Sequence, residues 1–570
     1  MANNNDWRRI ANGNGLPSEG YCDQPYVVVT PDGAWLCTMT TGSGEEGDTG
    51  QHVVSMRSTD CGKTWSAPVD IEPPGPPEAS WVMPLKTDSG RVYAFYVYNK
   101  DNMRSVIAGT EYARRRVDTL GAYMFKYSDD GGRTWSQQRF EVPVREFDID
   151  RRNPYGGKVR FFWGVGKPIT HNGTVHIGMS KVGRFGEGFL ATSEGFFLSS
   201  KNILTQSDPA KIVWETLPDG DTGLRAPGGP IAEEQNATFL SDGKLYCTYR
   251  TTQGRICHAY SSDGGHTWTP PQYATYANGR PIKHPRAANF VRRFSNGKYL
   301  LWHHNHGGKW YDDRNPAWLS GGIERDGRIL WSQPEIALYD DEPESRMSYP
   351  DFIEDDGRIF ITETQKTIAR VHEIDRRLLD ALWHQRETAE AARDGVILEL
   401  HGDACTAGST ADALKLPHLS RRESFSIEFV ITLDSLAGGQ IIVDTRNDAG
   451  AGVCLATTNR NTIEISLNDS RTQCAWDCDP GTIREGVKHH IVVIVDGGPK
   501  IISFVVDGVL CDGGDVRQFG WGRFNRDLRT PDGREKLRIA PNLNDKIHLL
   551  RIYGRYLLTS EAIGNFRNAG

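Results

Sequence analysis

Short runs of alternating hydrophobic and polar residues recur along most of the chain, and this alternation is typical of half-buried β-strands. Examples between residues 26 and 364 are YVVVTPDGAWLCTMT, RVYAFYVYN, TVHIGMS, KLYCTYRT, KYLLWHHN and RIFITET. Segments rich in glycine, proline, aspartate and asparagine separate these runs, as expected for tight turns. The pattern predicts a large all-β protein.

A repeat accompanies the strands. An octapeptide S-x-D-x-G-x-T-W occurs three times, as STDCGKTW at 58–65, SDDGGRTW at 128–135 and SSDGGHTW at 261–268. The starts are 70 and 133 residues apart, so degenerate copies are expected near residue 195, in LATSEGFFLSSKN, and near 325, in ERDGRILW. In such a box, Asp and Ser cap a hairpin turn, glycine supplies a positive φ, and Trp packs into the adjacent sheet. About four strands per repeat predict six sheets over residues 1–390, and radial closure predicts a six-bladed β-propeller.

The character of the sequence changes after this region. A helical segment is expected over 375–393, and residues 395–570 contain no box. Strands are expected there in SFSIEFVITL, GQIIVDT, NTIEISLN, HHIVVIVDG and IISFVVDGVL, which predicts a second all-β domain of the β-sandwich type. This part resembles the laminin G/concanavalin A-like jelly rolls, a resemblance that implies a glycan-binding or bracing role.

Composition supports many turns and excludes several functions. Glycine and proline make up about 16% of the 570 residues, and there are 15 tryptophans. A net charge of −7 without a basic stripe argues against a nucleic-acid binder, and no apolar run is long enough to span a membrane. The start MANNNDWRRIANGNG has no apolar leader, so a cytoplasmic location is expected, or a secreted or periplasmic one if the start is engineered. The ten scattered cysteines form no zinc-binding pattern, and no metal or cofactor is expected.

The boxes and the segments around them resemble the sialidase superfamily over about residues 1–390. AEEQNATFLSDGKLYCTYRTTQGRICHAYSSDGGHTW is similar to the fourth-blade signature, in which a glutamate and an arginine sixteen residues later face the site. The resemblance implies these roles for Glu234 and Arg250. SRMSYPDFIEDDGRIFITET resembles the region of the nucleophilic tyrosine, which implies Tyr349 as nucleophile and Glu234 as its base. A neutral phenol suits a substrate that is anionic near the reacting carbon, where a carboxylate nucleophile would be repelled.

The resemblance also implies a general acid in a loop of the first blade. That loop is TTGSGEEGDTGQHVV, where Asp48 matches the family position best and Glu46 is next. Histidines offer further polar contacts with a substrate, and we include His52 and His304 among the binding candidates. His304 and His306 alternate along a predicted strand and so share one face, but a pair is more often hydrogen-bonded structure than a metal site.

One position departs from the family. Sialidases begin the first inner strand with an arginine that opens a three-arginine clamp for the substrate carboxylate, and Asp23 stands there in YCDQPYVVVTPDG. A carboxylate at this point would repel an anionic substrate. Asp23 and Gln24 could instead bind sugar hydroxyls, as neutral or uronic sugars require. The remaining clamp candidates are Arg250, Arg314, Arg346 as a substitute for Arg314, and Lys167.

These residues predict an exo-acting, retaining glycoside hydrolase that removes a sialic-acid-like or other acidic sugar from a glycan. A second hypothesis is a lyase of uronate-containing glycans, with His52, His303, Tyr349 and Arg250 around the abstracted proton. A third is a non-catalytic glycan-binding propeller. The presence of both Glu234 and Tyr349 favours an enzyme, because a lectin does not need this pair.

Overall fold

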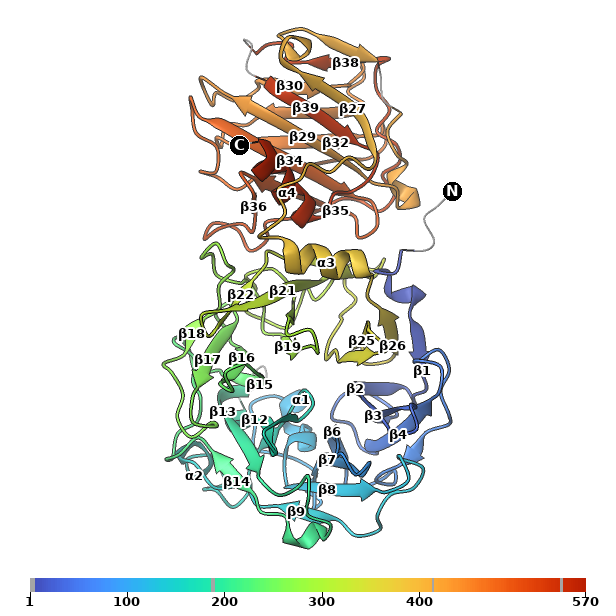
Figure 1. The fold of residues 1–570 in the computed structure, drawn as a ribbon, viewed down its shortest axis with the longest axis vertical. Coiled ribbons are helices and arrows are strands. Elements are labelled where there is room, and N and C mark those ends of the chain that lie inside the picture. Colours follow the sequence, from blue (N-terminus) through green and yellow to red (C-terminus); the bar gives the residue numbers. More distant parts are fainter. Residues whose placement is uncertain (1–5, 186–189, 413–414, 544–546, 570) are drawn as a thin grey trace.

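A computed structural model describes residues 6–185, 190–412, 415–543 and 547–569, and the all-β prediction is confirmed. Residues 14–373, which we call the six-sheet domain, form six antiparallel sheets of four or five strands. In Figure 1 the strands β2, β6, β15 and β19, each the first of its sheet, lie nearest a common centre.

The first three sheets follow one another along the chain. The first contains β2 (Tyr21–Val29), β3 (Trp35–Gly42), β4 (His52–Ser58) and β5 (Val69–Asp70). The second contains β6 (Ala79–Lys86), β7 (Val92–Tyr98), β8 (Ala122–Ser128) and β9 (Phe140–Val142). The third contains β10 (Phe162–Trp163), β11 (Ile169–His171), β12 (Thr174–Phe185), β13 (Leu190–Ser200) and β14 (Glu215–Leu217).

The next three sheets complete the domain, and the last of them takes a strand from the start of the chain. The fourth contains β15 (Glu233–Phe239), β16 (Leu245–Arg250), β17 (Cys257–Ser261) and β18 (Gln272–Tyr273). The fifth contains β19 (Phe290–Arg293), β20 (Tyr299–His303), β21 (Ala317–Arg325), β22 (Arg328–Trp331) and β23 (Glu335–Leu338). The sixth contains β24 (Phe352–Asp355), β25 (Arg358–Thr364), β26 (Ala369–Glu373) and β1 (Asn14–Leu16). The β1–β26 pairing joins the two ends of the domain.

The three boxes have the same internal hydrogen bonds. In the second box the Asp130 carboxylate accepts from the Thr134 amide at 2.9 Å and from the Thr134 hydroxyl at 2.6 Å, and Ser128 Oγ accepts from Gly132 N. The tryptophans of the second and third boxes pack on the preceding sheet: Trp135 Nε1 donates to Ser55 Oγ at 2.9 Å, and the ring of Trp268 stacks on a phenylalanine of β13. The boxes therefore hold consecutive sheets together.

Replacing Asp130 by alanine should lower the free energy of unfolding by about 1–2 kcal/mol, because the turn amides and the Thr134 hydroxyl lose their acceptor. Chemical denaturation measures the change. Asp101→Ala, a change at an exposed turn residue without a side-chain hydrogen bond among the described residues, is the control. Equal stability of the two variants would contradict a structural role for the box.

Two sequence expectations need correction. The segment near residue 195 is not a turn, because it lies within β13, and the corresponding turn follows it, where Asn202 and Ser200 share a hydrogen bond of 3.2 Å. The helix α3 (Arg376–His384) is shorter than expected. It begins where the Asp375 carboxylate caps the Arg377 amide at 2.7 Å, and residues 388–393 are not helical. Near residue 325 the turn is present, between β21 and β22.

The remaining helical segments of the described chain are short. They are η1 (Ile10–Asn12), α1 (Glu111–Arg114), η2 (Val117–Thr119), α2 (Asp148–Arg151), η3 (Pro209–Lys211), η4 (Gly402–Cys405), η5 (Leu419–Arg421) and α4 (Thr559–Ala569). None of the helices in the described residues has the length and hydropathy needed to cross a membrane.

The C-terminal region contains two further sheets. One contains β27 (Val396–His401), β29 (Phe425–Thr432), β34 (Lys488–Asp496), β35 (Ile501–Val506), β36 (Val509–Leu510), β37 (Gly522–Arg523) and β39 (Ile547–Tyr553). The other contains β28 (Thr410–Asp412), β30 (Ile441–Asp444), β31 (Gly452–Thr457), β32 (Ile463–Asn468), β33 (Gln473–Asp477) and β38 (Lys536–Ile539). Both contribute to one hydrophobic core, with Phe429 and Leu467 among its fully buried members. All ten cysteines are free thiols.

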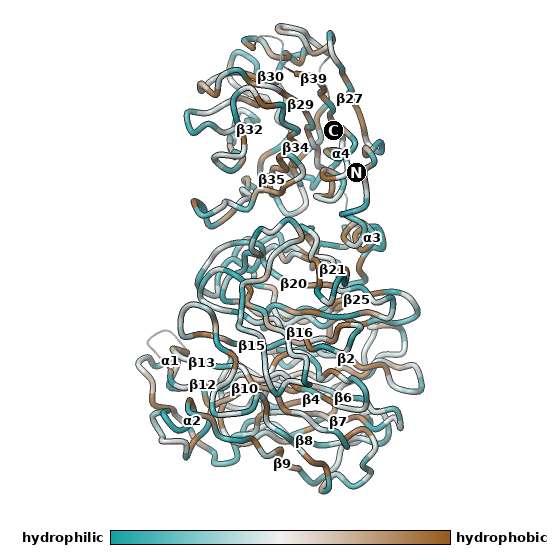
Figure 2. The backbone as a smooth tube through the Cα atoms, turned by 60° about the vertical axis from the view of Figure 1, so that its left-hand side comes forward, coloured by the Kyte–Doolittle hydropathy of each residue, from teal (hydrophilic) through white to brown (hydrophobic). Residues whose placement is uncertain are grey.

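The two regions meet at α3, which lies between them in both views (Figures 1 and 2). The Glu335 carboxylate on β23 accepts hydrogen bonds from the amides of Thr559 and Ser560 at the start of α4. Arg8, near the N-terminus, forms an ion pair with Asp496 at 2.7 Å. The C-terminal region therefore rests on the fifth sheet and on the N-terminal segment.

Candidate active site

The first strands of several sheets have an irregular backbone conformation at equivalent points. The pairing of β2, β6 and β15 with their neighbours is shifted around Gln24, Trp81 and Glu234, and these residues have φ values of 58°, 64° and 61°. Tyr349, just before β24, has a φ of 45°. A positive φ is unfavourable for residues other than glycine, and a bulge turns a side chain in a new direction. Such strain is common at functional sites.

The residues near these bulges form one network of polar side chains, buried except for the half-buried Glu46 and Lys366, which we call the central cluster. Its members are Asp23, Glu46, Trp81, Arg116, Asp118, Glu233, Glu234, Arg250, Arg286, Arg314, Tyr349 and Lys366. They come from strand ends and loops of five of the six sheets, and they enter the cluster from the same end of the first strands.

Tyr349 and Glu234 form the centre of the cluster. Tyr349 Oη donates to Glu234 Oε1 at 2.8 Å, and both residues are at most 4% exposed. Burial and the Glu234 carboxylate raise the pKa of Tyr349 well above its usual value, so the phenol is neutral. Burial also raises the pKa of Glu234, while Arg250, 2.9 Å from the same oxygen, partly opposes this. The pair is arranged for transfer of the phenol proton to a carboxylate.

Three arginines surround this pair. Arg250 and Arg286 both hold the Glu233 carboxylate, with Arg250 Nε at 2.8 Å, and this contact fixes the guanidinium of Arg250 beside Glu234. Arg314 Nη1 donates to the hydroxyl of Ser348 at 2.6 Å, while its buried Nε has no hydrogen-bond partner. An unpaired buried N–H of a cation is costly unless a ligand accepts from it. Arg314 therefore has the capacity to bind an anion.

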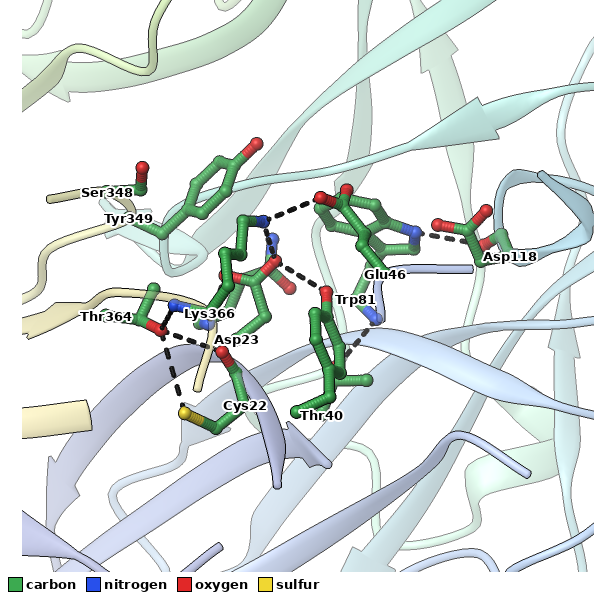
Figure 3. Close-up of polar contacts among 12 residues, drawn as sticks. Cys22, Asp23, Thr40, Glu46, Trp81, Asp118, Ser348, Tyr349, Thr364 and Lys366 are labelled. Atoms are coloured by element: carbon green, nitrogen blue, oxygen red, sulfur yellow. Dashed lines mark hydrogen bonds and ion pairs between the residues drawn. The ribbon is translucent and has the colours of Figure 1, made fainter. Parts of the chain in front are cut away.

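Lys366 occupies the other side of Tyr349 (Figure 3). Its Nζ lies 2.5 Å from Asp23 Oδ2, 3.1 Å from Glu46 Oε2 and 4.4 Å from the centroid of the Tyr349 ring. In the sequence, Asp23 is an unopposed negative charge in place of the clamp arginine. The structure pairs it with Lys366, so a cation is still present at this side of the site.

The two carboxylates that share Lys366 differ in pKa. Burial raises the pKa of Asp23 to about 6, with Lys366 opposing and Glu46 adding to the shift. For Glu46, burial acts in the same direction, but Lys366 and Arg116 outweigh it and hold its pKa at about 2. Groups whose environments separate their pKa values in this way are candidates for different roles in acid–base catalysis.

The remaining members of the central cluster contact Glu46 and Tyr349. Arg116 bridges Glu46 and Asp118, at 3.0 and 2.8 Å. The indole of Trp81 donates to the Asp118 carbonyl at 2.9 Å and meets the Tyr349 ring edge-to-face, with 6.1 Å between the centroids. The cluster thus contains five cationic side chains and five carboxylates, and its charges balance when all are ionised.

The structure brings together five of the residues predicted from the sequence, namely Asp23, Glu234, Arg250, Arg314 and Tyr349. The side chain of Gln24 makes its contact outside the central cluster. Gln24 donates to the Gly164 carbonyl at 3.1 Å, and its buried Oε1 has no partner. Asp48 instead accepts from the Glu45 amide and lies 3.6 Å from Arg115. In this loop Glu46, not Asp48, contacts the cluster.

Four other candidates make their contacts elsewhere. Arg346 pairs with Asp312 at the surface, and Lys167 pairs with Asp351 at 2.8 Å. His52 lies at the start of β4 near the Glu19 and Asp70 carboxylates, and His304 faces the Pro316 carbonyl. His303, invoked for a lyase, lies 3.2 Å from the Ser320 hydroxyl. The histidines required by the lyase hypothesis therefore have no contact with Tyr349.

Sequence reasoning missed Lys366, Trp81, Arg116 and the Glu233–Arg286 pair. Lys366 follows the strand RIFITET by two residues, and its carbonyl accepts from the Cys22 amide at the start of β2, a contact that the sequence does not reveal. Within the described part of the chain, no group of three or more histidine, cysteine or acidic side chains has the arrangement of a metal site.

Comparisons with known proteins agree with this architecture. Residues 82–361 match the model of a BNR repeat-like domain, and residues 408–563 match that of the concanavalin A-like lectin/glucanases superfamily. The chain therefore combines a BNR repeat-like domain with a concanavalin A-like domain. A comparison with curated proteins finds no match.

Solved structures with a similar shape include sialidases. A Trypanosoma rangeli sialidase is 14% identical, with 98% of this chain and 97% of that chain covered and a TM-score of 0.43. An intramolecular trans-sialidase from Ruminococcus gnavus is 16% identical, with 65% and 99% covered and a TM-score of 0.44. A Dyadobacter fermentans protein of unknown function is 16% identical, with 64% and 97% covered and a TM-score of 0.46.

Proposed function

We propose that the six-sheet domain is a six-bladed β-propeller and that it acts as an exo-acting, retaining glycoside hydrolase on a glycan ending in an acidic sugar. The observation that carries this proposal is the buried hydrogen bond of 2.8 Å between Tyr349 and Glu234. The arrangement of the first strands around one centre supports the propeller, because a shared axis brings residues from distant blades together.

Tyr349 is the nucleophile of the proposed reaction. Its Oη attacks the anomeric carbon while the phenol proton passes to Glu234, and the bond from the anomeric carbon to the leaving oxygen breaks. A phenol whose pKa is raised by burial is a poor nucleophile without such a base. Arg250 stabilises the Glu234 carboxylate before transfer and is available to the substrate afterwards.

Three cations around Tyr349 are suited to a carboxylate on the sugar. Arg250 is linked to the Tyr349 hydroxyl through Glu234. Arg314 is hydrogen-bonded to Ser348, the residue before Tyr349. Lys366 lies over the Tyr349 ring. Lys366 takes the place of the missing clamp arginine, although lysine is a point charge without the bidentate geometry of arginine. Because Asp23 and Glu46 compensate Lys366, an anionic substrate competes with them for this cation.

Asp23 is the proposed proton donor. It shares Lys366 with Glu46, and of these two carboxylates only Asp23 has a pKa near neutrality, at about 6. Its protonation also frees Lys366 for the substrate. In the first step Asp23 gives its proton to the leaving oxygen. In the second, it takes a proton from the attacking water, the bond to Tyr349 breaks, and Glu234 returns the phenol proton.

A panel of aryl sialosides, uronides and neutral glycosides tests this function. We expect release of phenol from an acidic glycoside. We also expect NMR to show that the first-formed sugar has the anomeric configuration of the substrate. An unsaturated uronate product would establish the lyase hypothesis instead. Binding of glycans without turnover of any member would establish a glycan-binding protein.

The pH dependence of kcat/KM should be bell-shaped. Activity rises as Glu234 loses its proton, because the base must be ionised, and it falls as the pH rises through about 6, because Asp23 must be protonated. Initial rates with one alkyl glycoside, measured between pH 4 and 9, check both limbs. A profile that stays flat above pH 6 would contradict the assignment of Asp23.

A further inference from the structure

A cavity lies at the ends of the sheets away from the central cluster, lined by β11 of the third sheet and by the first strands of the other five. It encloses about 490 Å³. Its walls are formed, in chain order, by residues 27–29, 84–86, 167–171, 238–239, 292–294 and 352–354, one segment from each sheet. We call it the distal cavity.

Cationic side chains outnumber carboxylates in the lining of the distal cavity. Its lining includes four cationic side chains, those of Lys86, Lys167, Arg292 and Arg293, and a single carboxylate, that of Glu354. The carboxylate is already engaged, because it accepts from the amide of Ser295 at 2.9 Å. Asp351, just outside the lining, compensates Lys167, which leaves an excess of two positive charges in a chain with a net charge of −7.

Two of these cations are available to a ligand. Among the described residues, the side chains of Lys86 and Arg292 form no ion pair or hydrogen bond, and Arg293 approaches the Tyr299 hydroxyl, which is neutral. Lys167 is paired with Asp351 at 2.8 Å. Burial lowers the pKa of Lys167 to about 8, and Arg292 contributes to the shift through repulsion. Like charges gathered at one opening focus a positive potential that attracts anions.

We propose that the distal cavity binds a sulfate or phosphate group carried by a monosaccharide. The guanidinium of Arg292 or Arg293 suits two oxygens of such a group, and Lys86 adds a point charge. The cavity has the volume of a small-molecule site and exceeds what a single inorganic ion fills. His171, stacked on Phe239 with 4.4 Å between centroids, offers a polar edge to the sugar ring. This site is separate from the reaction at the central cluster.

Isothermal titration of the full chain with glucose 6-sulfate tests the proposal, with glucose and inorganic sulfate as comparison ligands. We expect saturable binding of glucose 6-sulfate, weaker binding of sulfate and no binding of glucose. The double change Arg292→Gln and Arg293→Gln should weaken binding at least about tenfold, because charge-assisted hydrogen bonds are lost. Arg325→Gln, a change to an exposed strand-end arginine outside the cavity, should leave binding unchanged.

A second readout follows from Lys167. An anion bound nearby favours the protonated amine, so binding at pH 8 should take up protons, which calorimetry in buffers of different ionisation enthalpy detects. Absence of saturable binding, or equal affinity of the wild type and the double variant, would overturn the site. Sulfate binding as tightly as glucose 6-sulfate would overturn the sugar-ester ligand. Thermal unfolding of each variant shows whether it is folded, and activity at the central cluster is unaffected in either case.

Discussion

Replacing Tyr349 by phenylalanine should lower kcat for an acidic aryl glycoside by about 10³-fold or more, because the reaction loses its nucleophile. The change removes one hydroxyl and keeps the aromatic contacts with Trp81 and Lys366. Glu234 then loses the donor on Oε1 but keeps Arg250 at 2.9 Å, so the buried carboxylate remains paired. Steady-state kinetics on the purified variant measures the loss.

A matched control separates catalysis from packing. Tyr123 is another buried tyrosine of the six-sheet domain, and its hydroxyl has no hydrogen-bond partner among the described residues. Tyr123→Phe removes the same atom from the hydrophobic core and should leave kcat within about twofold of the wild type. Turnover by Tyr349→Phe at the wild-type rate would show that another group forms the covalent intermediate, or that none does.

Asp23→Asn is expected to lower kcat/KM by about 10²-fold for glycosides with poor leaving groups, because asparagine has no acidic proton to donate. With an activated aryl leaving group, which departs without protonation, the loss should be much smaller. The decrease in activity above pH 6 should also disappear, since the group that causes it is gone. Parallel rate measurements on alkyl and nitrophenyl glycosides of the same sugar reveal the difference.

The same substitution also changes the charge around Lys366. Asparagine can still accept from Lys366 and from Tyr21, whose hydroxyl donates to Asp23 at 2.9 Å. With one carboxylate removed, Lys366 is freer to bind an anionic sugar, so KM should not rise. This separation of kcat from KM distinguishes loss of a proton donor from general damage to the site.

Asp150→Asn provides the comparison for Asp23→Asn. Asp150 and Lys181 form another buried aspartate–lysine pair, at 2.5 Å, outside the central cluster. Breaking that pair should lower the stability of the protein. Any change in rate should be the same for substrates with good and with poor leaving groups. If Asp23→Asn affects alkyl and aryl substrates equally, Asp23 is a structural residue and the proton comes from another group.

Local patterns were sufficient for much of the fold. The alternating segments KLYCTYRT and RIFITET are strands β16 and β25, since a half-buried strand requires this alternation wherever its sheet lies. The boxes could be identified because the hydrogen bonds that close their turns lie within seven residues. The helix over 375–393 was overestimated, because its second half has helical composition but no α-helical backbone in the structure.

The candidate site was only partly predictable, because local strand pairing places some of its residues and turn geometry places the others. Glu234 and Arg250 lie on adjacent strands of one hairpin, so their spacing alone places them together. The loop acids could not be ranked in this way. Asp48 and Glu46 are two residues apart, and only the turn geometry directs Glu46 to Lys366 and Arg116 while Asp48 caps the Glu45 amide.

By itself the sequence determined the all-β architecture and the repeated turns, and its resemblance to the sialidase superfamily implied the pairing of a tyrosine with a glutamate and an arginine. The tertiary structure alone decided what Asp23 does. The sequence shows an acid where sialidases have an arginine, which suggests a site that repels anions. In the folded chain Lys366, 343 residues later, lies 2.5 Å from that acid. Charge compensation depends on distances in space, and β2 packs beside the sixth sheet only in the folded chain, so the electrostatic character of the site exists only after folding.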